Sequence, residues 1–265
     1  MNIYVGPMQR AAIEASRIVL RHYRDGAEAR AKGDGSPVTA ADEEAEAVIL
    51  AVLAEECPDV PVIAEEAVAG GAVPKASERF FLVDPLDGTK EFITGTDEFT
   101  VNIALIENGE AVAGVVTTPA LGTLFVGVHG TGATRTPYDF AAGEALGDAE
   151  EISVRAAPHE GRIAMTSRSH GSPETQAMLD RLGVKDVLAA GSSLKFCAIA
   201  EGRADLYPRL GRTMEWDTAA AHAVLRAAGG EVYVFENQER GAPLRYGKEQ
   251  RGFDNPHFLA VGKDA

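Results

Sequence analysis

The chain has 265 residues, of which 45% are hydrophobic and 25% are charged, and its formal net charge is −15. These values are ordinary for a soluble globular protein, and no apolar run reaches the roughly 18 residues that a membrane helix needs. The negative charge argues against a nucleic-acid-binding protein, because that affinity depends on many Lys and Arg contacts with phosphates. A small anionic ligand remains compatible with the charge, since bound divalent cations can reverse the local field.

Two further features bear on the compartment. The N-terminal residues lack the basic region, the apolar region and the cleavage site of a secretory signal, so we expect a cytoplasmic location. Cys57 and Cys197 lie far apart in helix-like segments, which indicates buried reduced thiols rather than a disulfide framework or a zinc site.

The first half begins with two helical patterns. Apolar residues recur at three- and four-residue spacing from Pro7 to about Lys32, where Gly33 and Gly35 follow, and a second helix is predicted for residues 42–56. Strand-like apolar runs come next, at residues 60–64, 80–83, 100–106, 111–117 and 123–128, with a turn at residues 107–109. The pattern predicts helices packed against a largely antiparallel meander.

An irregular, acidic stretch at residues 137–150 is the predicted boundary between two domains, residues 1–150 and 151–265. Beyond it, strand-like runs at residues 163–165, 187–189 and 206–207 alternate with helices that begin near Pro173, Ser192 and Asp217. This alternation is typical of an α/β arrangement.

The strongest chemical signal is the segment at residues 83–89, Val-Asp-Pro-Leu-Asp-Gly-Thr, in which an apolar strand leads into two carboxylates. We expect Pro85 to stop the sheet ladder, so that Asp84, Asp87 and the Leu86 carbonyl converge as an all-oxygen site suited to Mg²⁺. Gly88 permits close approach of the backbone to a ligand, and a helix beginning near Thr89 would add N–H groups for an anion. Taken alone, the segment is equally compatible with an ordinary turn.

Three more segments place carboxylates at the end of an apolar run or at the start of a predicted helix. Glu65 and Glu66 follow a short apolar run, Asp217 opens a helix after Trp216, and Asp42 opens the second helix. Each has a plainer explanation, because paired acids usually form a solvated face and Asp is a good helix-capping residue.

Together these segments resemble the inositol monophosphatase superfamily of lithium-sensitive, magnesium-dependent phosphatases, whose pattern pairs Glu-Glu, Asp-Pro-x-Asp-Gly-Thr and Trp-Asp-x-Ala. The order and spacing match over nearly the whole chain, with Ala64 standing where the family usually has Gly. Residues 86–93, 99–104, 167–170, 191–197 and 205–209 make the chain similar to the CysQ-type 3′(2′),5′-bisphosphate nucleotidases in particular. The resemblance implies a layered α-β-α-β-α sandwich, that is, an α+β or α/β fold.

Site roles follow from the resemblance, position by position. It implies one Mg²⁺ on Glu65, Asp84 and the Leu86 carbonyl, a second on Asp84, Asp87 and Asp217, and a third, looser ion near Glu65. It further implies that Asp42 and Thr89 orient an attacking water in a direct in-line displacement. The implied substrate-binding residues are Gly88, Thr89, His170, Ser192, Lys195 and Arg209. Each polar member of this set is a plausible donor to phosphate, although alone each has a surface or structural explanation.

The implied reaction is hydrolysis of the 3′-phosphate of adenosine 3′,5′-bisphosphate (PAP) to AMP and phosphate, which belongs to sulfur assimilation. An inositol or other sugar monophosphatase is the main alternative, and a non-catalytic acidic metal-binding protein is a minor one. The expected partner is a phosphorylated nucleotide, with no nucleic acid and no membrane segment, and the chain is expected to be a monomer or a homodimer.

Overall fold

The computed structural model describes residues 2–26, 29–31, 37–72, 75–168, 173–237 and 239–263. Its helices are α1 (Val5–Asp25), α2 (Ala40–Glu56), α3 (Glu65–Ala69), α4 (Thr89–Ile93), α5 (Pro173–Arg181), α6 (Leu194–Ala200), α7 (Ala219–Ala227) and the 3₁₀ turn η1 (Glu249–Arg251). The strands of the first half are β1 (Ala29–Ala31), β2 (Pro37–Thr39), β3 (Val62–Ala64), β4 (Arg79–Asp87), β5 (Thr100–Glu107), β6 (Glu110–Thr118), β7 (Thr123–Val128), β8 (Gly132–Asp139), β9 (Glu144–Ala145) and β10 (Glu150–Ile152). Those of the second half are β11 (Arg162–Ser167), β12 (Val184–Ala190), β13 (Leu206–Arg209), β14 (Glu231–Glu236), β15 (Glu239–Pro243) and β16 (Phe258–Val261).

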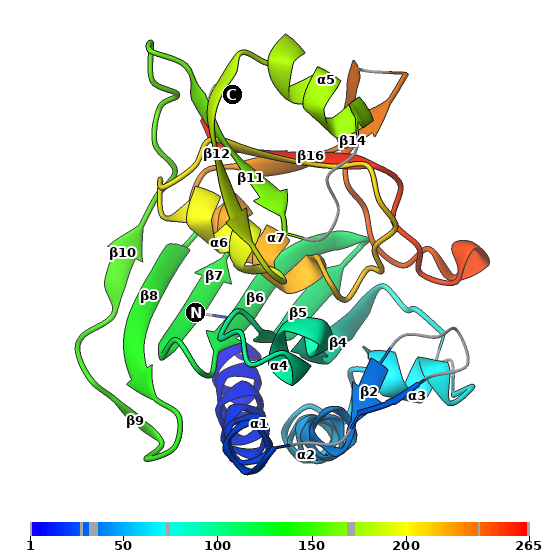
Figure 1. The fold of residues 1–265 in the computed structure, drawn as a ribbon. Coiled ribbons are helices and arrows are strands. Elements are labelled where there is room, and N and C mark those ends of the chain that lie inside the picture. The colour runs from blue at the N-terminus through cyan, green and yellow to red at the C-terminus, as the bar shows by residue number, and fades with distance from the viewer. Residues whose placement is uncertain are drawn as a thin grey trace.

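The elements stack in five layers. Helices α1 and α2 cover one face of the first sheet, and α6 and α7 lie between this sheet and the second one, whose far side carries α5 (Figure 1). This is the layered α-β-α-β-α sandwich that the family resemblance implied, and the expectation is confirmed. None of the helices in the described part of the chain is both long and apolar enough to span a membrane.

The first sheet has the order β10-β8-β7-β6-β5-β4-β3, and neighbours from β4 to β8 pair antiparallel. The expected meander is therefore confirmed. The expected turn between β5 and β6 is also present, with Asn108 at φ 50° and Gly109 at φ 77°, the positive angles that a tight hairpin requires. Strand β3 joins the sheet parallel to β4, so that Glu65 and Asp84 emerge at neighbouring positions.

Two local predictions about the first half were wrong. Helix α1 ends at Asp25 instead of continuing to Lys32, because Gly26 takes φ 79°, which a helix cannot continue through. Gly33 and Gly35, the expected stop signals, lie outside the described residues.

Pro85 was expected to end the strand, yet β4 continues to Asp87. The ladder with β5 pairs Asp84 with Asn102 and resumes at Asp87 with Thr100, so Pro85 and Leu86 form a bulge opposite a single residue. Pro85 lacks an N–H, which the bulge does not need. The register shift at the bulge changes the direction in which the side chains after it point.

The second sheet has the order β12-β11-β13-β16-β14-β15. Strands β11, β12 and β13 confirm the predicted runs with longer bounds, and α5 begins at Pro173 as predicted. Helices α6 and α7 begin two residues later than predicted, at Leu194 and Ala219. Strands β14, β15 and β16 were not predicted.

A large apolar core joins the two sheets through α6 and α7, and it contains Phe80 and Val116 from the first sheet together with Phe196 and Val224 from the middle helices. Residues 150–152 still belong to the first sheet, because β10 pairs with β8. The division into domains at residue 150 remains a prediction.

Candidate metal centre and phosphate site

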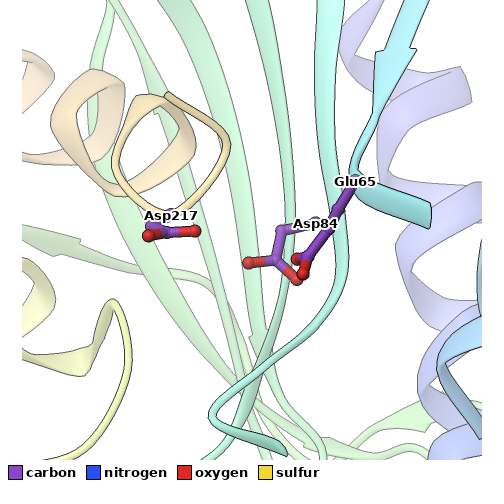
Figure 2. Close-up of side chains that lie close together, drawn as sticks. All are labelled: Glu65, Asp84 and Asp217. Atoms are coloured by element: carbon purple, nitrogen blue, oxygen red, sulfur yellow. The ribbon is translucent and has the colours of Figure 1, made fainter. Parts of the chain in front are cut away.

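Three carboxylates from distant parts of the chain meet between the sheets. Glu65 begins α3, Asp84 lies on β4 immediately before the bulge, and Asp217 lies two residues before α7; one ligand oxygen from each falls within 4.8 Å of the others. Figure 2 shows Glu65 and Asp84 pointing toward the same spot, with Asp217 facing them from the α7 side. Asp84 is 1% exposed.

The electrostatics of this cluster fit a divalent cation. Burial raises the pKa of Asp84 well above its ordinary value, and the nearby Glu65, Asp87 and Asp217 raise it further. The pKa of Asp217 is raised in the same way, by burial and then by Asp87 and Glu65. Carboxylates held this close in a buried place stay ionised only with a compensating cation, and they hold protons without one. The donors are all oxygen, which suits Mg²⁺.

Asp87 lies beside this cluster and has a backbone partner of its own. Its Oδ2 accepts a hydrogen bond from the Ser193 N–H at 2.6 Å. Burial raises the pKa of Asp87 to about 6, although Lys195 and the Ser193 N–H oppose that rise. The Leu86 carbonyl accepts from the Thr89 hydroxyl at 3.2 Å. Metal-binding roles for Asp87 and the Leu86 carbonyl therefore remain predictions.

Asp42 and Thr89 lie together, as the family resemblance implied. Thr89 Oγ1 is 3.2 Å from Asp42 Oδ1, and it is equally far from the Leu86 carbonyl. Asp42 is also a capping residue, because its Oδ2 accepts from the Thr39 N–H at 2.8 Å and from the Thr39 hydroxyl at 2.7 Å, which completes a capping box on α2. Both explanations of Asp42 thus have a structural basis.

Asp217 does not cap α7. Its Oδ2 accepts a hydrogen bond from the Met214 N–H, three residues earlier, at 2.8 Å. The N-cap residue of α7 is Thr218, and its side chain makes no capping bond. The carboxylate of Asp217 is therefore turned away from the helix and toward Glu65 and Asp84.

Ser192, Lys195 and Arg209, three of the predicted substrate residues, line a pocket of about 130 Å³ next to these acids, together with Asp87, Gly88 and Asp217. Lys195 is 4% exposed, and its Nζ donates to the carbonyls of Ser192 at 2.5 Å and Ala190 at 3.2 Å. Burial lowers the pKa of Lys195 to about 8.

Ser192 and Arg209 present unused donors at this pocket. Within the described residues, Ser192 Oγ and Arg209 Nε are buried polar atoms without a hydrogen-bond partner. Buried polar groups in folded proteins are normally satisfied, so these two atoms point to a ligand. His170, the remaining predicted substrate residue, lies outside the described residues.

Sequence reasoning missed two buried acids that position the cluster. Glu46 is 5% exposed, and its carboxylate accepts from the N–H groups of Glu66 and Ala67, each at 2.7 Å, which fixes the start of α3 and with it Glu65. Glu46 follows Asp42 by four residues, on the same face of α2, and this spacing was the available signal.

Glu215 is the second missed acid. It is fully buried and accepts from the N–H groups of Gly247 and Lys248 and from Lys248 Nζ, which anchors the segment before Asp217. No local pattern distinguishes Glu215 from a surface acid, because its partners are more than thirty residues away.

Comparison with known proteins shows the family of the chain. A model described as the inositol monophosphatase family matches residues 4–257. The chain belongs to this family. It is 45% identical to the 3′(2′),5′-bisphosphate nucleotidase CysQ of Escherichia coli strain K12 over 227 residues, which is 86% of each protein.

Solved structures share the fold. The crystal structure of CysQ from Bacteroides thetaiotaomicron, described as a bacterial member of the inositol monophosphatase family, matches with a TM-score of 0.79 and 39% identity over 98% of this chain and 97% of that one. An inositol monophosphatase from Anabaena matches with a TM-score of 0.74 and 26% identity, covering 97% and 90%.

Proposed function

We propose that this chain hydrolyses the 3′-phosphate of adenosine 3′,5′-bisphosphate to AMP and phosphate with the help of Mg²⁺. Relatives that are 45% identical carry the name 3′(2′),5′-bisphosphate nucleotidase, and the chain is an enzyme of this class. The observation that supports the finer proposal most is the shared pocket, which combines the acid side of the site with Lys195, Arg209 and the unpartnered Ser192 hydroxyl.

The acid side of the site would hold the reacting phosphate through bound metal. Glu65, Asp84 and Asp217, with Asp87 beside them, would hold the metal, and a bound Mg²⁺ would lower the pKa of a water and offset the charge of the phosphate. Asp42 accepts the proton of the attacking water, and Thr89, 3.2 Å from Asp42, fixes the position of that water. Water attacks the phosphorus in line, with no phosphorylated side chain, and the bond to the 3′-oxygen breaks as that oxygen takes up a proton from solvent.

The second half binds the phosphate that is not hydrolysed. Lysine carries three N–H donors, and Lys195 commits two of them to the carbonyls of Ala190 and Ser192, so its third donor has a fixed direction. The pKa of about 8 leaves Lys195 mostly protonated at pH 7. Arg209 supplies a fork of donors on the same pocket. In a chain of net charge −15, a second phosphate needs cationic partners of its own.

An inositol or other sugar monophosphatase is the second candidate, since the family and the Anabaena structure bear that name. The same acids would serve it. A compact polyol phosphate, however, offers no second phosphate for Lys195 and Arg209. A non-catalytic metal-binding protein is less well supported, because it gives no role to the paired Asp42 and Thr89.

The test is phosphate release from PAP, 3′-AMP and inositol 1-phosphate, with and without Mg²⁺, for the wild type, Lys195→Ala and Arg209→Ala. We expect each variant to lose about ten- to a hundredfold in kcat/KM on PAP, as for a charge-assisted contact of about 1.5–3 kcal/mol, and little on the other substrates. Lys185→Ala, an exposed lysine on β12, is the control. Equal losses on all three substrates would contradict the assignment of these residues to a second phosphate.

A further inference from the structure

Glu98 links the two halves of the molecule at the edge of the site. It lies between α4 and β5 in the first half, and its carboxylate binds two places in the second half. Oε1 accepts from Arg168 Nη2 at 2.6 Å, and Oε2 accepts from Arg168 Nε at 2.8 Å and from the Gly191 N–H at 2.8 Å. Arg168 immediately follows β11, and Gly191 immediately follows β12. One side chain thus holds the ends of two neighbouring strands.

The contact at Gly191 is too close for any other residue. A Cβ at this position would lie 2.7 Å from the Glu98 carbonyl and 2.9 Å from Glu91 Cγ. The residue after it, Ser192, has φ 45°, which is uncommon for a residue with a side chain. Backbone strain of this kind persists only where the surroundings fix it, and here Glu98 is part of those surroundings.

The turn that Glu98 holds, residues 190–193, carries the substrate side of the pocket. Its Ser193 N–H donates to Asp87 at 2.6 Å, while the carbonyls of Ala190 and Ser192 accept from Lys195 Nζ. Its Ser192 hydroxyl is buried and unpartnered at the pocket. The turn is therefore held between Glu98 on one side and Asp87 on the other, and its position sets where Ser192 and Lys195 lie relative to the acids.

An ordinary surface ion pair would not hold the turn 190–193 in place. The Arg168 side chain is 51% exposed, and an ion pair of that kind contributes little by itself. The Glu98 side chain is only 19% exposed, and its bond to the Gly191 N–H acts on the backbone of the turn directly.

We propose that Glu98 is a positioning residue that fixes the turn 190–193 against the first half, so that Ser192 and Lys195 meet the phosphate that is not hydrolysed at a set distance from the metal-binding acids. The proposal rests on the proposed function. Glu98 touches no reacting atom, so its effect falls on the binding of bisphosphates rather than on the chemical step.

The experiment compares Glu98→Gln with wild type on PAP and on 3′-AMP. We expect KM for PAP to rise about five- to thirtyfold while kcat stays within about threefold, and kinetics on 3′-AMP to change by less than about threefold. Glu98→Asp, which keeps the charge, should recover part of the affinity for PAP. The matched control is Glu107→Gln, which breaks the ion pair with Arg79 at the opposite end of β4 and β5. This variant should leave KM and kcat on both substrates unchanged.

A second variant separates the contact of Glu98 with Arg168 from its contact with the Gly191 N–H, and it tests the proposal even where Glu98→Gln folds poorly. Arg168→Met removes the exposed ion pair and leaves the hydrogen bond from the Gly191 N–H to Glu98, so its KM for PAP should rise less than that of Glu98→Gln. A full effect in Arg168→Met would mean that Arg168 itself meets the substrate, and it would overturn the proposal. Equal losses on PAP and 3′-AMP, or a fall in kcat alone, would overturn it as well. The wild type's own preference between the two substrates tests the proposed function separately.

Discussion

Asp42 divides its two carboxylate oxygens between two tasks. Oδ2 accepts from the N–H and the hydroxyl of Thr39, which closes the capping box of α2, and Oδ1 faces the Thr89 hydroxyl. The proposed function adds a role in the chemistry to this capping role, so a mutation of Asp42 affects stability and turnover together, and a second variant that removes only the cap separates the two.

We expect Asp42→Asn to lower kcat by at least about a hundredfold with KM within about threefold, because an amide cannot accept the proton of the attacking water. Stability should fall by about 1 kcal/mol, since the one oxygen of Asn cannot serve both Thr39 and Thr89. Thr39→Ala is the control, because it should cost a similar stability and leave kcat within about threefold. Steady-state kinetics and urea unfolding measure both quantities. If the two variants have the same turnover, Asp42 is a capping residue and not a base.

Among the elements, α7 shows how closely the site depends on packing. Gly114 on β6 and Gly127 on β7 are paired neighbours, and α7 lies directly over them. A Cβ on Gly114 would lie 2.1 Å from the Ala220 carbonyl, and one on Gly127 would lie 2.4 Å from the Cα of Val224. Asp217 lies two residues before this helix, so how closely α7 packs on the sheet sets the distance between Asp217 and Asp84.

Gly114→Ala should therefore disturb both stability and the metal site. Overpacking of this kind typically costs about 1–3 kcal/mol, and a backbone atom at this distance places the variant at the upper end. We also expect the Mg²⁺ concentration for half-maximal activity to rise about threefold or more, as Asp217 shifts with α7. Gly147→Ala, whose nearest neighbour would be 3.9 Å away, is the control for both measurements. An unchanged Mg²⁺ requirement in a destabilised Gly114→Ala would uncouple the packing of α7 from Asp217.

Local patterns predicted these elements unevenly. Strands β4 to β7 and helix α2 carry strong apolar runs, and all were predicted to within a few residues. The end of α1 was not predicted correctly. The pair Gly33 and Gly35 is a stronger helix-stop signal in the sequence than the single Gly26, but the helix ends at Gly26 because this residue takes a positive φ. Strands β14 and β16 were overlooked although Glu231–Glu236 and Phe258–Val261 are apolar runs of the kind that indicates a strand. Their order in the sheet, with β16 between β13 and β14, is what no local pattern encodes.

At the scale of the whole molecule, the site lies where the first sheet meets the layer of α6 and α7. Glu65, Asp84 and Asp87 come from the first half, while Asp217 and Lys195 come from the second. The motifs singled out the acids, because a strand that leads into paired carboxylates is a recognisable local pattern, and the family resemblance singled out Lys195. They could not predict the contacts of Glu98 and Glu215 with backbone N–H groups that only the folded chain brings near, and for Glu46 the available signal was its four-residue spacing from Asp42.

The acid cluster also makes stability depend on metal and pH together. Burial raises the pKa of Asp84, Asp87 and Asp217 above the unfolded value near 3.9, with Asp87 at about 6. Without metal, the folded state then binds more protons than the unfolded state in this window, so stability is greatest below pH of about 4 with respect to these groups and falls as pH rises through 6 and beyond. Bound Mg²⁺ keeps the same carboxylates ionised and stabilises the fold by mass action, more strongly as pH rises.

The difference between the melting temperatures in excess Mg²⁺ and in EDTA should therefore grow from about pH 5 to about pH 8. The net charge of −15 shifts both melting curves with pH, but the difference between them isolates the site. Asp84→Asn removes one carboxylate from the cluster, so it should lose most of the difference and should melt higher than wild type in EDTA at pH 8. A difference that is the same at both ends of this pH range would mean that Mg²⁺ binds elsewhere, or that the three aspartates are ionised in the metal-free fold.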